Sequence, residues 1–284
     1  GAQLSAAEQV QGIMFTGSTE VAKILQKTVA KRLSKNGESI PLIAETGGQN
    51  AMIVDSSALT EQVVLDVVSS AYDSAGQRCS ALRVLCVQED NADAVIQMLK
   101  GAMQQLQVGN PYLLKTDIGP VIDAEAQENI QKHIDKMRQK GHRVHQLMRN
   151  DAQDSELDAG TFITPTLIEL PNLNDLEREV FGPVLHVIRF NQGSLKQLLE
   201  HINSKGYGLT MGLHTRIDET IQTVMTHAEV GNLYINRNIV GAVVGVQPFG
   251  GEGLSGTELS RLKAKVKLAW ASALNNILPR FDLV

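Results

Sequence analysis

The chain has 284 residues, of which 43% are hydrophobic and 20% are charged, and its formal net charge is −5. This composition is ordinary for a globular protein with a sizeable core, and it gives no sign of the basic surface that binds nucleic acids. The sequence contains no run of about 18 apolar residues, the length that spans a membrane. Two cysteines, Cys79 and Cys86, do not make a disulfide framework, so we expect a reducing compartment.

Predicted strands and helices alternate along most of the chain. Residues 11–15 form a short apolar run that predicts a strand, and residues 19–33 carry apolar side chains at helical spacing after a glycine turn. In chain order, the sequence then predicts strands at 41–43 and 51–54, a helix at 59–72, a strand at 83–87, helices at 91–106 and 124–140, strands at 164–169 and 185–190, a helix at 195–203, a strand at 210–214, a helix at 219–227 and a strand at 232–236. Residues 150–158 are polar and acidic, as in a surface loop. The alternation predicts an α/β fold with a parallel sheet.

Cys79 is the residue that most suggests covalent chemistry. It follows a Gly-Gln-Arg turn and precedes small residues, in the sequence Ser-Ala-Gly-Gln-Arg-Cys-Ser at 74–80. A thiol in such a turn is a candidate nucleophile, and we expect the cation of Arg78 to lower its pKa. The alternative is a buried structural thiol, the role that we assign to Cys86 because it lies inside an apolar run.

A carboxylate and a possible anion site come earlier in the chain. Glu45 precedes Thr-Gly-Gly, a turn that leaves room for a water beside the carboxylate, so Glu45 is a candidate general base; an ordinary strand-end carboxylate is the alternative. Gly17 and Ser18 lie between the first predicted strand and its helix, where backbone N–H groups suit a phosphate. A simple helix cap is the alternative there. The dinucleotide fingerprint Gly-x-Gly-x-x-Gly is absent from the sequence.

Two later segments are candidates for ligand contacts. Glu179 and Phe181 lie in Glu-Val-Phe-Gly-Pro, which is either a binding loop or an acidic loop closed by a Gly-Pro turn. Residues 241–251 are glycine-rich and apolar, which also fits a flexible loop. His142 and His145 have no evident third ligand, so we predict no metal site and a solvated polar face there.

Together these motifs resemble the aldehyde dehydrogenase superfamily, from about residue 10 to about residue 257. Residues 44–55, Ala-Glu-Thr-Gly-Gly-Gln-Asn-Ala-Met-Ile-Val-Asp, are most similar to the Δ1-pyrroline-5-carboxylate (glutamate semialdehyde) dehydrogenase domain of bacterial bifunctional proline utilization A proteins. The resemblance implies the end of a Rossmann-type NAD-binding domain at residues 1–46, an α/β catalytic domain at 47–247 and a C-terminal segment at 248–284.

The resemblance also implies roles for the motif residues. Cys79 would form a thiohemiacetal and then a thioester, and Glu45 would activate the water that hydrolyses the thioester. NAD is the implied cofactor. Its binding residues would be Gly17 and Ser18 at the pyrophosphate, Glu179 at the nicotinamide ribose and Phe181 near the nicotinamide.

The implied reaction is oxidation of L-glutamate γ-semialdehyde to L-glutamate in proline catabolism. Residues 241–242 would hold the substrate α-carboxylate through the backbone N–H groups of Gly241 and Ala242. Ser80 would add a hydroxyl, Phe249 would pack on the aliphatic part of the substrate, and Arg78 would complete the substrate site.

The wider expectations follow from the same resemblance. We expect a cytoplasmic enzyme whose longer parent is a homo-oligomer, with attachment of that parent to the inner membrane left open. FAD would belong only to a proline-oxidising module that lies outside this chain. Two alternatives remain: a broad-specificity aldehyde dehydrogenase, and an inactive segment that serves structure or association.

The chain departs from the family pattern at both ends. It begins Gly-Ala, and we expect the first Rossmann strands, a ribose-binding lysine and an oxyanion-hole asparagine to lie upstream of Gly1. Beyond residue 257 the expected Gly/Pro-rich segment is replaced by residues 258–284, which have apolar side chains at helical spacing. This tail is either an amphipathic helix for a membrane or partner, or an ordinary packing helix or a sequence introduced by truncation or frameshift. We therefore expect low activity from this chain alone.

Overall fold

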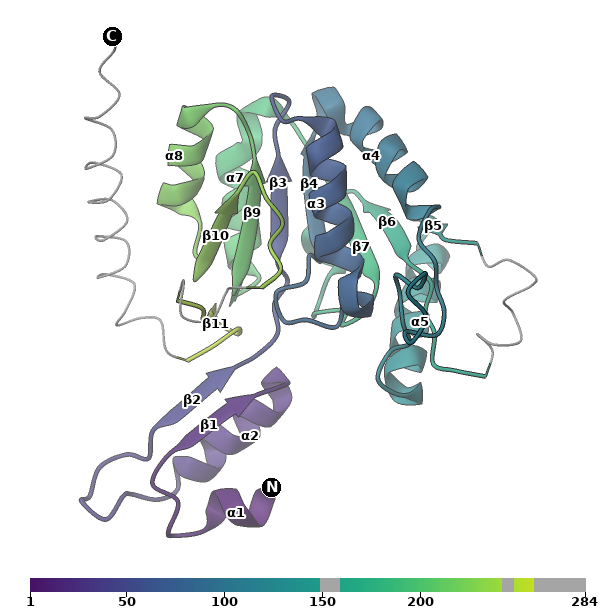
Figure 1. The fold of residues 1–284 in the computed structure, drawn as a ribbon. Coiled ribbons are helices and arrows are strands. Elements are labelled where there is room, and N and C mark those ends of the chain that lie inside the picture. The colour runs from purple at the N-terminus through teal and green to yellow at the C-terminus, as the bar shows by residue number, and fades with distance from the viewer. Residues whose placement is uncertain (149–158, 242–247, 258–284) are drawn as a thin grey trace.

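The computed structural model describes residues 1–148, 159–241 and 248–257. The predicted loop at 150–158, the predicted tail helix at 258–284 and Ala242 lie outside the described residues. The N-terminal part forms a small unit below the main body in Figure 1. Its elements are α1 (Ala2–Ala6), β1 (Ile13–Thr16), α2 (Thr19–Val29) and β2 (Leu42–Glu45). β1 and β2 pair in parallel, with Thr16 opposite Glu45, and α2 packs against β2.

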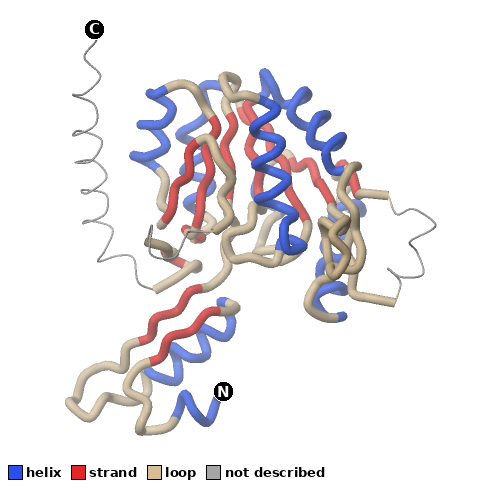
Figure 2. Tube along the Cα trace, in the orientation of Figure 1, coloured by secondary structure: helices blue, strands red, loops and turns tan. Residues whose placement is uncertain are grey.

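A seven-stranded sheet forms the centre of the main body (Figure 1, Figure 2). Its order is β10-β9-β3-β4-β7-β6-β5. The strands are β3 (Ala51–Val54), β4 (Val84–Gln88), β5 (Arg143–Gln146), β6 (Thr166–Leu170), β7 (Val184–Phe190), β9 (Thr210–His214) and β10 (Asn232–Ile235). All neighbouring strands are parallel except the edge pair β5 and β6. A separate antiparallel pair is formed by β8 (Tyr207–Gly208) and β11 (Glu252–Gly253).

Helices cover both faces of this sheet. The remaining helices are α3 (Thr60–Tyr72), α4 (Glu89–Met103), α5 (Ala124–Gln139), α7 (Leu195–Ser204) and α8 (Asp218–His227). α3 packs on α4, and α7 packs on α8. Because right-handed crossovers place helices on opposite faces when the chain reverses its direction across a sheet, these two pairs lie on opposite sides. Each of the residues in β3 and β4 is consequently buried, as expected for parallel strands covered on both faces.

The predicted α/β class with a parallel sheet is confirmed, and each of the predicted strands and helices up to residue 236 is present at or near its predicted position. Among the α-helices and strands of the described residues, α1, β5, β8 and β11 were not predicted. They are two to five residues long, too short for hydrophobic periodicity to distinguish them. Among the helices of the described ranges, none is long and apolar enough to cross a membrane.

Candidate active site

The predicted catalytic residues lie at the amino edge of the seven-stranded sheet. Glu45 precedes β3, Cys79 precedes β4 and Glu179 precedes β7. These three strands are parallel, so the segments that enter them meet at one edge. The Cys79 thiol therefore lies close enough to both carboxylates for their charges to raise its pKa. Sequence positions up to 134 residues apart are brought into one site.

The loop that leads to Cys79 has an unusual backbone. Ser74, Ala75 and Gly76 all have positive φ angles, of 56°, 53° and 65°. A Cβ at Gly76 would overlap the carbonyl oxygen of Gly182, so only glycine allows this approach of the two loops. The left-handed backbone at Ser74 and Ala75 is strained for residues with a Cβ, and such strain is typical of functional loops.

Asn50 fixes the other side of the nucleophile loop. Its Nδ2 donates to the carbonyl oxygens of Cys79, at 2.7 Å, and Ala81, at 2.9 Å. Its Oδ1 accepts the backbone N–H of Thr210 at 3.1 Å. Asn50 is buried. The hydrogen bonds of its side-chain amide link the segment before β3 to the segment before β4 and to the first residue of β9.

Cys79 is held as a thiol in this arrangement. Burial raises its pKa, and the charges of Glu179 and Glu45 raise it further, against hydrogen bonds from the backbone N–H groups of Ser80 and Cys79 that lower it. The pKa of Cys79 is thus raised, whereas the neighbouring Arg78 predicted a lowered value. The exposed side chain of Arg78 donates from Nε to Ser74 Oγ at 3.1 Å. Cys86 is fully buried in β4, and burial raises its pKa to about 12, which confirms the structural assignment.

Glu45 ends β2 and turns toward the C-terminal loop. Its Oε2 accepts the backbone N–H of Gly251 at 3.1 Å. The adjoining Thr46 donates from Oγ1 to the carbonyl oxygen of Leu254 at 2.5 Å. The carboxylate is half-buried, so it is oriented by the protein and still reaches solvent, as a group that activates water must.

Glu179 is held beside the same loops. Its Oε1 accepts from Nε and Nη2 of Arg83 at 3.2 and 2.9 Å, and the backbone N–H of Gly48 also bonds to the carboxylate. Burial raises the Glu179 pKa, and Arg83 opposes that shift. A Cβ at Gly47 would overlap Glu179 Oε2, so the glycine pair after Glu45 makes space for this second carboxylate. Phe181 is exposed, with its ring 5.1 Å from the guanidinium carbon of Arg83.

Gly17 and Ser18 lie exposed at the amino end of α2. Ser18 is the N-cap, and its Oγ accepts the backbone N–H of Val21 at 3.3 Å. The cap alternative is therefore correct as a description of Ser18 in this structure. It does not exclude an anion, because the Ser18 hydroxyl keeps its proton to donate.

The predicted substrate residues are brought together in part. Gly241, with φ of 78°, donates its N–H to Ser80 Oγ at 3.4 Å. Phe249 is exposed and follows Pro248, whose carbonyl oxygen accepts from Asn232 Nδ2 at 2.8 Å. Ala242 lies outside the described residues. The roles of Arg78, Ser80, Gly241 and Phe249 toward a substrate stay predictions.

The two histidines considered for a metal are placed differently from the prediction. His145 is a half-buried residue of β5, and the half-buried ring of His142 bonds through Nε2 to Asp175 Oδ2 at 2.9 Å. The predicted solvated face is wrong because the segment pairs with β6 as a strand of the sheet. In the described part of the chain, no group of three His, Cys, Asp or Glu side chains is placed to hold a metal ion.

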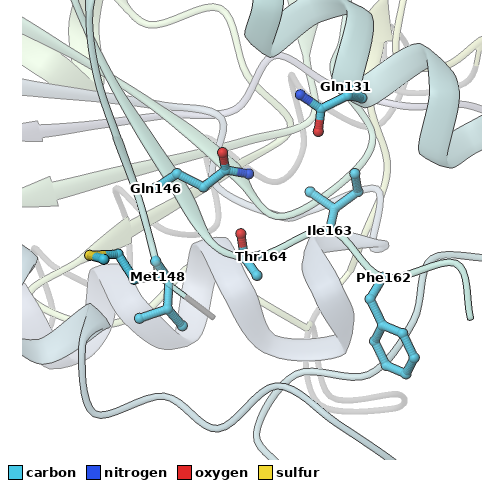
Figure 3. Close-up of a pocket in the computed structure, with 7 residues that line it drawn as sticks. Gln131, Gln146, Met148, Phe162, Ile163 and Thr164 are labelled. Carbon is cyan, nitrogen blue, oxygen red and sulfur yellow. The ribbon is translucent and has the colours of Figure 1, made fainter. Parts of the chain in front are cut away.

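A cavity of about 340 Å³ lies between the end of β5 and the segment that precedes β6 (Figure 3). Gln131 of α5, Gln146 of β5 and Thr164 contribute polar groups to it, and Phe162 contributes a ring. Its lining includes no predicted site residue. The cavity is therefore separate from the amino-edge site.

Sequence reasoning gave no role to Asn50, and it also missed Arg83. Arg83 was predicted only as the first residue of an apolar strand. The available signal was the charge itself, since an arginine that opens a fully apolar strand is buried only with several partners.

Comparisons with known proteins agree with the motifs. The family model described as aldehyde dehydrogenase family matches residues 1–270. The bifunctional protein PutA of Salmonella typhimurium is 66% identical over 258 residues, which are 90% of this chain and 20% of that protein. A 1-pyrroline-5-carboxylate dehydrogenase of Geobacillus thermodenitrificans is 36% identical over 248 residues, which are 87% of this chain and 47% of that protein.

Solved structures give the same result. A crystal structure of Bradyrhizobium japonicum proline utilization A has a TM-score of 0.83 at 49% identity, and the match covers 90% of this chain and 25% of that one. A 1-pyrroline-5-carboxylate dehydrogenase from Thermus, solved with bound NAD, has a TM-score of 0.79 at 34% identity, covering 90% and 48%. The chain thus spans about a fifth of the length of the bifunctional relatives and about half that of the 1-pyrroline-5-carboxylate dehydrogenases.

Proposed function

Because the chain belongs to the aldehyde dehydrogenase family, we propose that it carries the nucleophile and general base for oxidation of L-glutamate γ-semialdehyde to L-glutamate with NAD. The relatives named as PutA and as 1-pyrroline-5-carboxylate dehydrogenase support this substrate. The observation that carries the proposal is the meeting of Cys79 with Glu45 at one edge of the sheet, where the charge of Glu45 reaches the thiol.

The residues present fit NAD. The amino end of α2 is exposed at Gly17 and Ser18, and the backbone N–H groups and dipole there suit a pyrophosphate. The carboxylate of Glu179 offers acceptor oxygens to ribose hydroxyls. Phe181 presents an exposed ring beside it. The chemistry that NAD supplies when bound is acceptance of a hydride from the carbonyl carbon.

Cys79 and Glu45 divide the remaining chemistry. Sγ of Cys79 bonds to the aldehyde carbon and gives a thiohemiacetal, and loss of a hydride leaves a thioester on the same sulfur. Glu45 then takes a proton from a water as that water attacks the thioester carbon, and Cys79 leaves as the thiol or thiolate. The hydrogen bond from Gly251 to Glu45 Oε2 fixes the direction of that carboxylate.

The resting site favours the protonated thiol, because burial and two carboxylates raise the Cys79 pKa. The attack on an aldehyde therefore needs loss of the thiol proton to water, and Glu45 is assigned to the hydrolysis step alone.

The substrate end of the site lies at Ser80 and Gly241. The Gly241 N–H donates to the hydroxyl of Ser80, the residue after Cys79, at 3.4 Å. A carboxylate bound by these donors would place the aldehyde of a short chain at the sulfur. Binding energy of this remote group would then lower the barrier to attack.

The test is a substrate comparison in the intact protein. NADH formation is measured with L-glutamate γ-semialdehyde and with propanal, which has no carboxylate, and Cys79→Ala serves as the inactive control. We expect kcat/KM for the semialdehyde to exceed that for propanal by at least about 10²-fold, the worth of one well-bound carboxylate. Equal values would instead identify a broad-specificity enzyme, and the absence of NADH with both would contradict the proposed function.

A further inference from the structure

Arg83 is a buried cation at the centre of the amino-edge site. It is 1% exposed, although it carries a charge and lies next to an apolar strand. A buried guanidinium is stable only where its N–H groups donate hydrogen bonds. Here its donors go to two different loops.

The first loop is the one that leads to the nucleophile. Nη1 of Arg83 donates to the carbonyl oxygen of Gly76 at 2.6 Å, and Nη2 donates to that of Arg78 at 3.1 Å. Arg78 directly precedes Cys79. These two hydrogen bonds therefore brace both ends of the short segment between the left-handed turn and the sulfur.

The second loop carries Glu179 and Phe181. Nε and Nη2 of Arg83 donate to Glu179 Oε1 at 3.2 and 2.9 Å, and Nη1 also lies 3.3 Å from the carbonyl oxygen of Gly182. The Phe181 ring covers the guanidinium carbon at 5.1 Å. Three positions of this loop, Glu179, Phe181 and Gly182, are thus contacted by one side chain.

The backbone of Arg83 is held from the far side. The backbone N–H and Nδ1 of His186 donate to the Arg83 carbonyl oxygen at 2.9 and 3.0 Å. Because a carbonyl only accepts, Nδ1 of His186 carries the proton and its Nε2 accepts from His133 Nε2 at 2.9 Å. Arg83 is therefore fixed at both its main chain and its guanidinium.

We propose that Arg83 is a positioning residue that holds the nucleophile loop and the Glu179–Phe181 loop in register, so that the thiol and the cofactor carboxylate face one site. The inference rests on the proposed function. It requires the planar fork of arginine, because a lysine ammonium has three donors at one point and does not span the carbonyls of Gly76 and Arg78 together with the Glu179 carboxylate.

The Coulomb interactions at the site support this role. The charges of Glu179 and Cys79 both stabilise the buried guanidinium, and Coulomb attraction is mutual. Burial raises the pKa of the Cys79 thiol most, and the charges of Glu179 and Glu45 raise it further, against the attraction of Arg83. Loss of Arg83 would leave the Glu179 charge without its partner and would disfavour the thiolate further.

The experiment compares Arg83→Lys, Arg83→Met, Glu179→Gln and the double variant Arg83→Met/Glu179→Gln in the intact protein. Arg189→Met is the matched control, because Arg189 is also an arginine of the sheet but pairs with Glu89 and Asp93 at the surface. The first readout is the rate at which iodoacetamide labels Cys79 as a function of pH, without nucleotide. The second readout is the change in KM for NAD compared with the change in kcat. Thermal unfolding checks that each variant is folded.

We expect Arg83→Lys and Arg83→Met to slow Cys79 labelling at neutral pH, shift its midpoint to higher pH, and raise KM for NAD by about tenfold or more, the loss expected for one hydrogen bond to a charged group. Glu179→Gln should raise KM for NAD while moving the labelling midpoint to lower pH. In the double variant the midpoint should lie between those of the two single variants. Arg189→Met should match the wild type in both readouts.

Full rescue by Arg83→Lys would overturn the proposal, since charge alone would then suffice, and so would wild-type labelling in a folded Arg83→Met. If Arg83→Met does not fold, Arg83→Lys and the double variant decide the question by the same criteria. The labelling of Cys79 needs no catalysis, so it tests the positioning role of Arg83 even if the wild-type protein does not oxidise the semialdehyde. A wild-type protein that does not oxidise the semialdehyde would refute the proposed function alone.

Discussion

Cys79 and Cys86 are close in the sequence, but they differ in burial. Cys79 is half-buried beside solvent-reaching groups, while Cys86 is fully buried and has a pKa of about 12. Iodoacetamide should therefore label Cys79 well before Cys86 in the folded protein at neutral pH, because only the thiolate of an accessible sulfur reacts. Peptide mass spectrometry of a labelling time course measures this. Equal labelling of the two thiols in a folded sample would contradict the assignment.

The Glu45 charge should hold the Cys79 pKa above that of a free thiol. Glu45 and Glu179 both raise it, so Glu45→Gln should move the pH midpoint of Cys79 labelling downward, by up to about one unit for one nearby charge in a partly hydrated site. Glu38→Gln, which changes an exposed carboxylate in the small N-terminal unit, is the control. An unchanged midpoint in Glu45→Gln would show that the carboxylate does not face the sulfur.

The turn before Cys79 depends on glycine at position 76. Gly76→Ala would combine a φ of 65° with an overlap between the new Cβ and the Gly182 carbonyl oxygen. We expect a loss of about 1–3 kcal/mol in the free energy of unfolding and a large loss of activity. Gly101→Ala is the matched control, since Gly101 lies in α4 with open space around it, and helix propensity there favours alanine. Urea unfolding of both variants tests this, and equal stabilities would refute the steric argument.

The paired rings of His133 and His186 should make the fold acid-sensitive. Burial lowers the pKa of His186 to about 3 and that of His133 to about 4. Both values lie below the ordinary histidine pKa of about 6.5, so the unfolded chain takes up protons first as pH falls. Stability should be full above about pH 6.5 and decline below it, with His186 alone contributing about 1.4 kcal/mol per pH unit.

His186→Asn removes this titration and keeps an amide donor for the Arg83 carbonyl. The urea midpoint of this variant should fall less steeply than that of the wild type between pH 6 and pH 4, the range set by about 6.5 and the lowered values. Parallel slopes would show that His186 does not carry the acid sensitivity.

The positions of most strands and helices were predictable from the sequence, and the hydrogen-bond partners of the site residues were not. β3 and β9 have the predicted bounds because each is a short apolar run between turn residues. Cys79, Glu45 and Glu179 were found from their motifs. Arg83 was missed because its role depends on two loops that meet only through the parallel order of β4 and β7. The pKa of Cys79 was predicted in the wrong direction because Arg78 is adjacent in sequence but turns toward Ser74.

The small N-terminal unit exposes apolar side chains on β1 and on α2. Met14 is 82% exposed and Ile24 is 61% exposed. Exposed apolar groups beside a two-stranded sheet favour association. The 284-residue chain should therefore self-associate as its concentration rises, and Met14→Lys/Ile24→Lys should reduce this. Leu114→Lys, at a fully exposed leucine outside this unit, is the control. Sedimentation velocity measures the effect, and a chain that stays monomeric at every concentration would contradict it.

The site is unusual for an α/β protein because of the edge it occupies. Ligands of open parallel sheets usually bind at the carboxyl ends of the strands. Here Glu45, Cys79 and Glu179 all precede their strands. The N-terminal unit enters the main body at this same edge through β2 (Figure 1). The backbone N–H of Gly17, the residue after β1, donates to the Glu45 carbonyl oxygen at 3.1 Å. Glu45 therefore links the turn proposed to bind the nucleotide to the edge of the sheet that carries Cys79.

The most direct test of the account is to trap the acyl group on Cys79. Glu45→Gln in the intact protein is mixed with L-glutamate γ-semialdehyde and NAD, and NADH and the mass of the Cys79 peptide are followed together. We expect a burst of NADH close to one per site, followed by a stall, with an acyl adduct on Cys79 and none in the double variant with Cys79→Ala. Steady turnover of Glu45→Gln at the wild-type rate, without an adduct on Cys79, would contradict it.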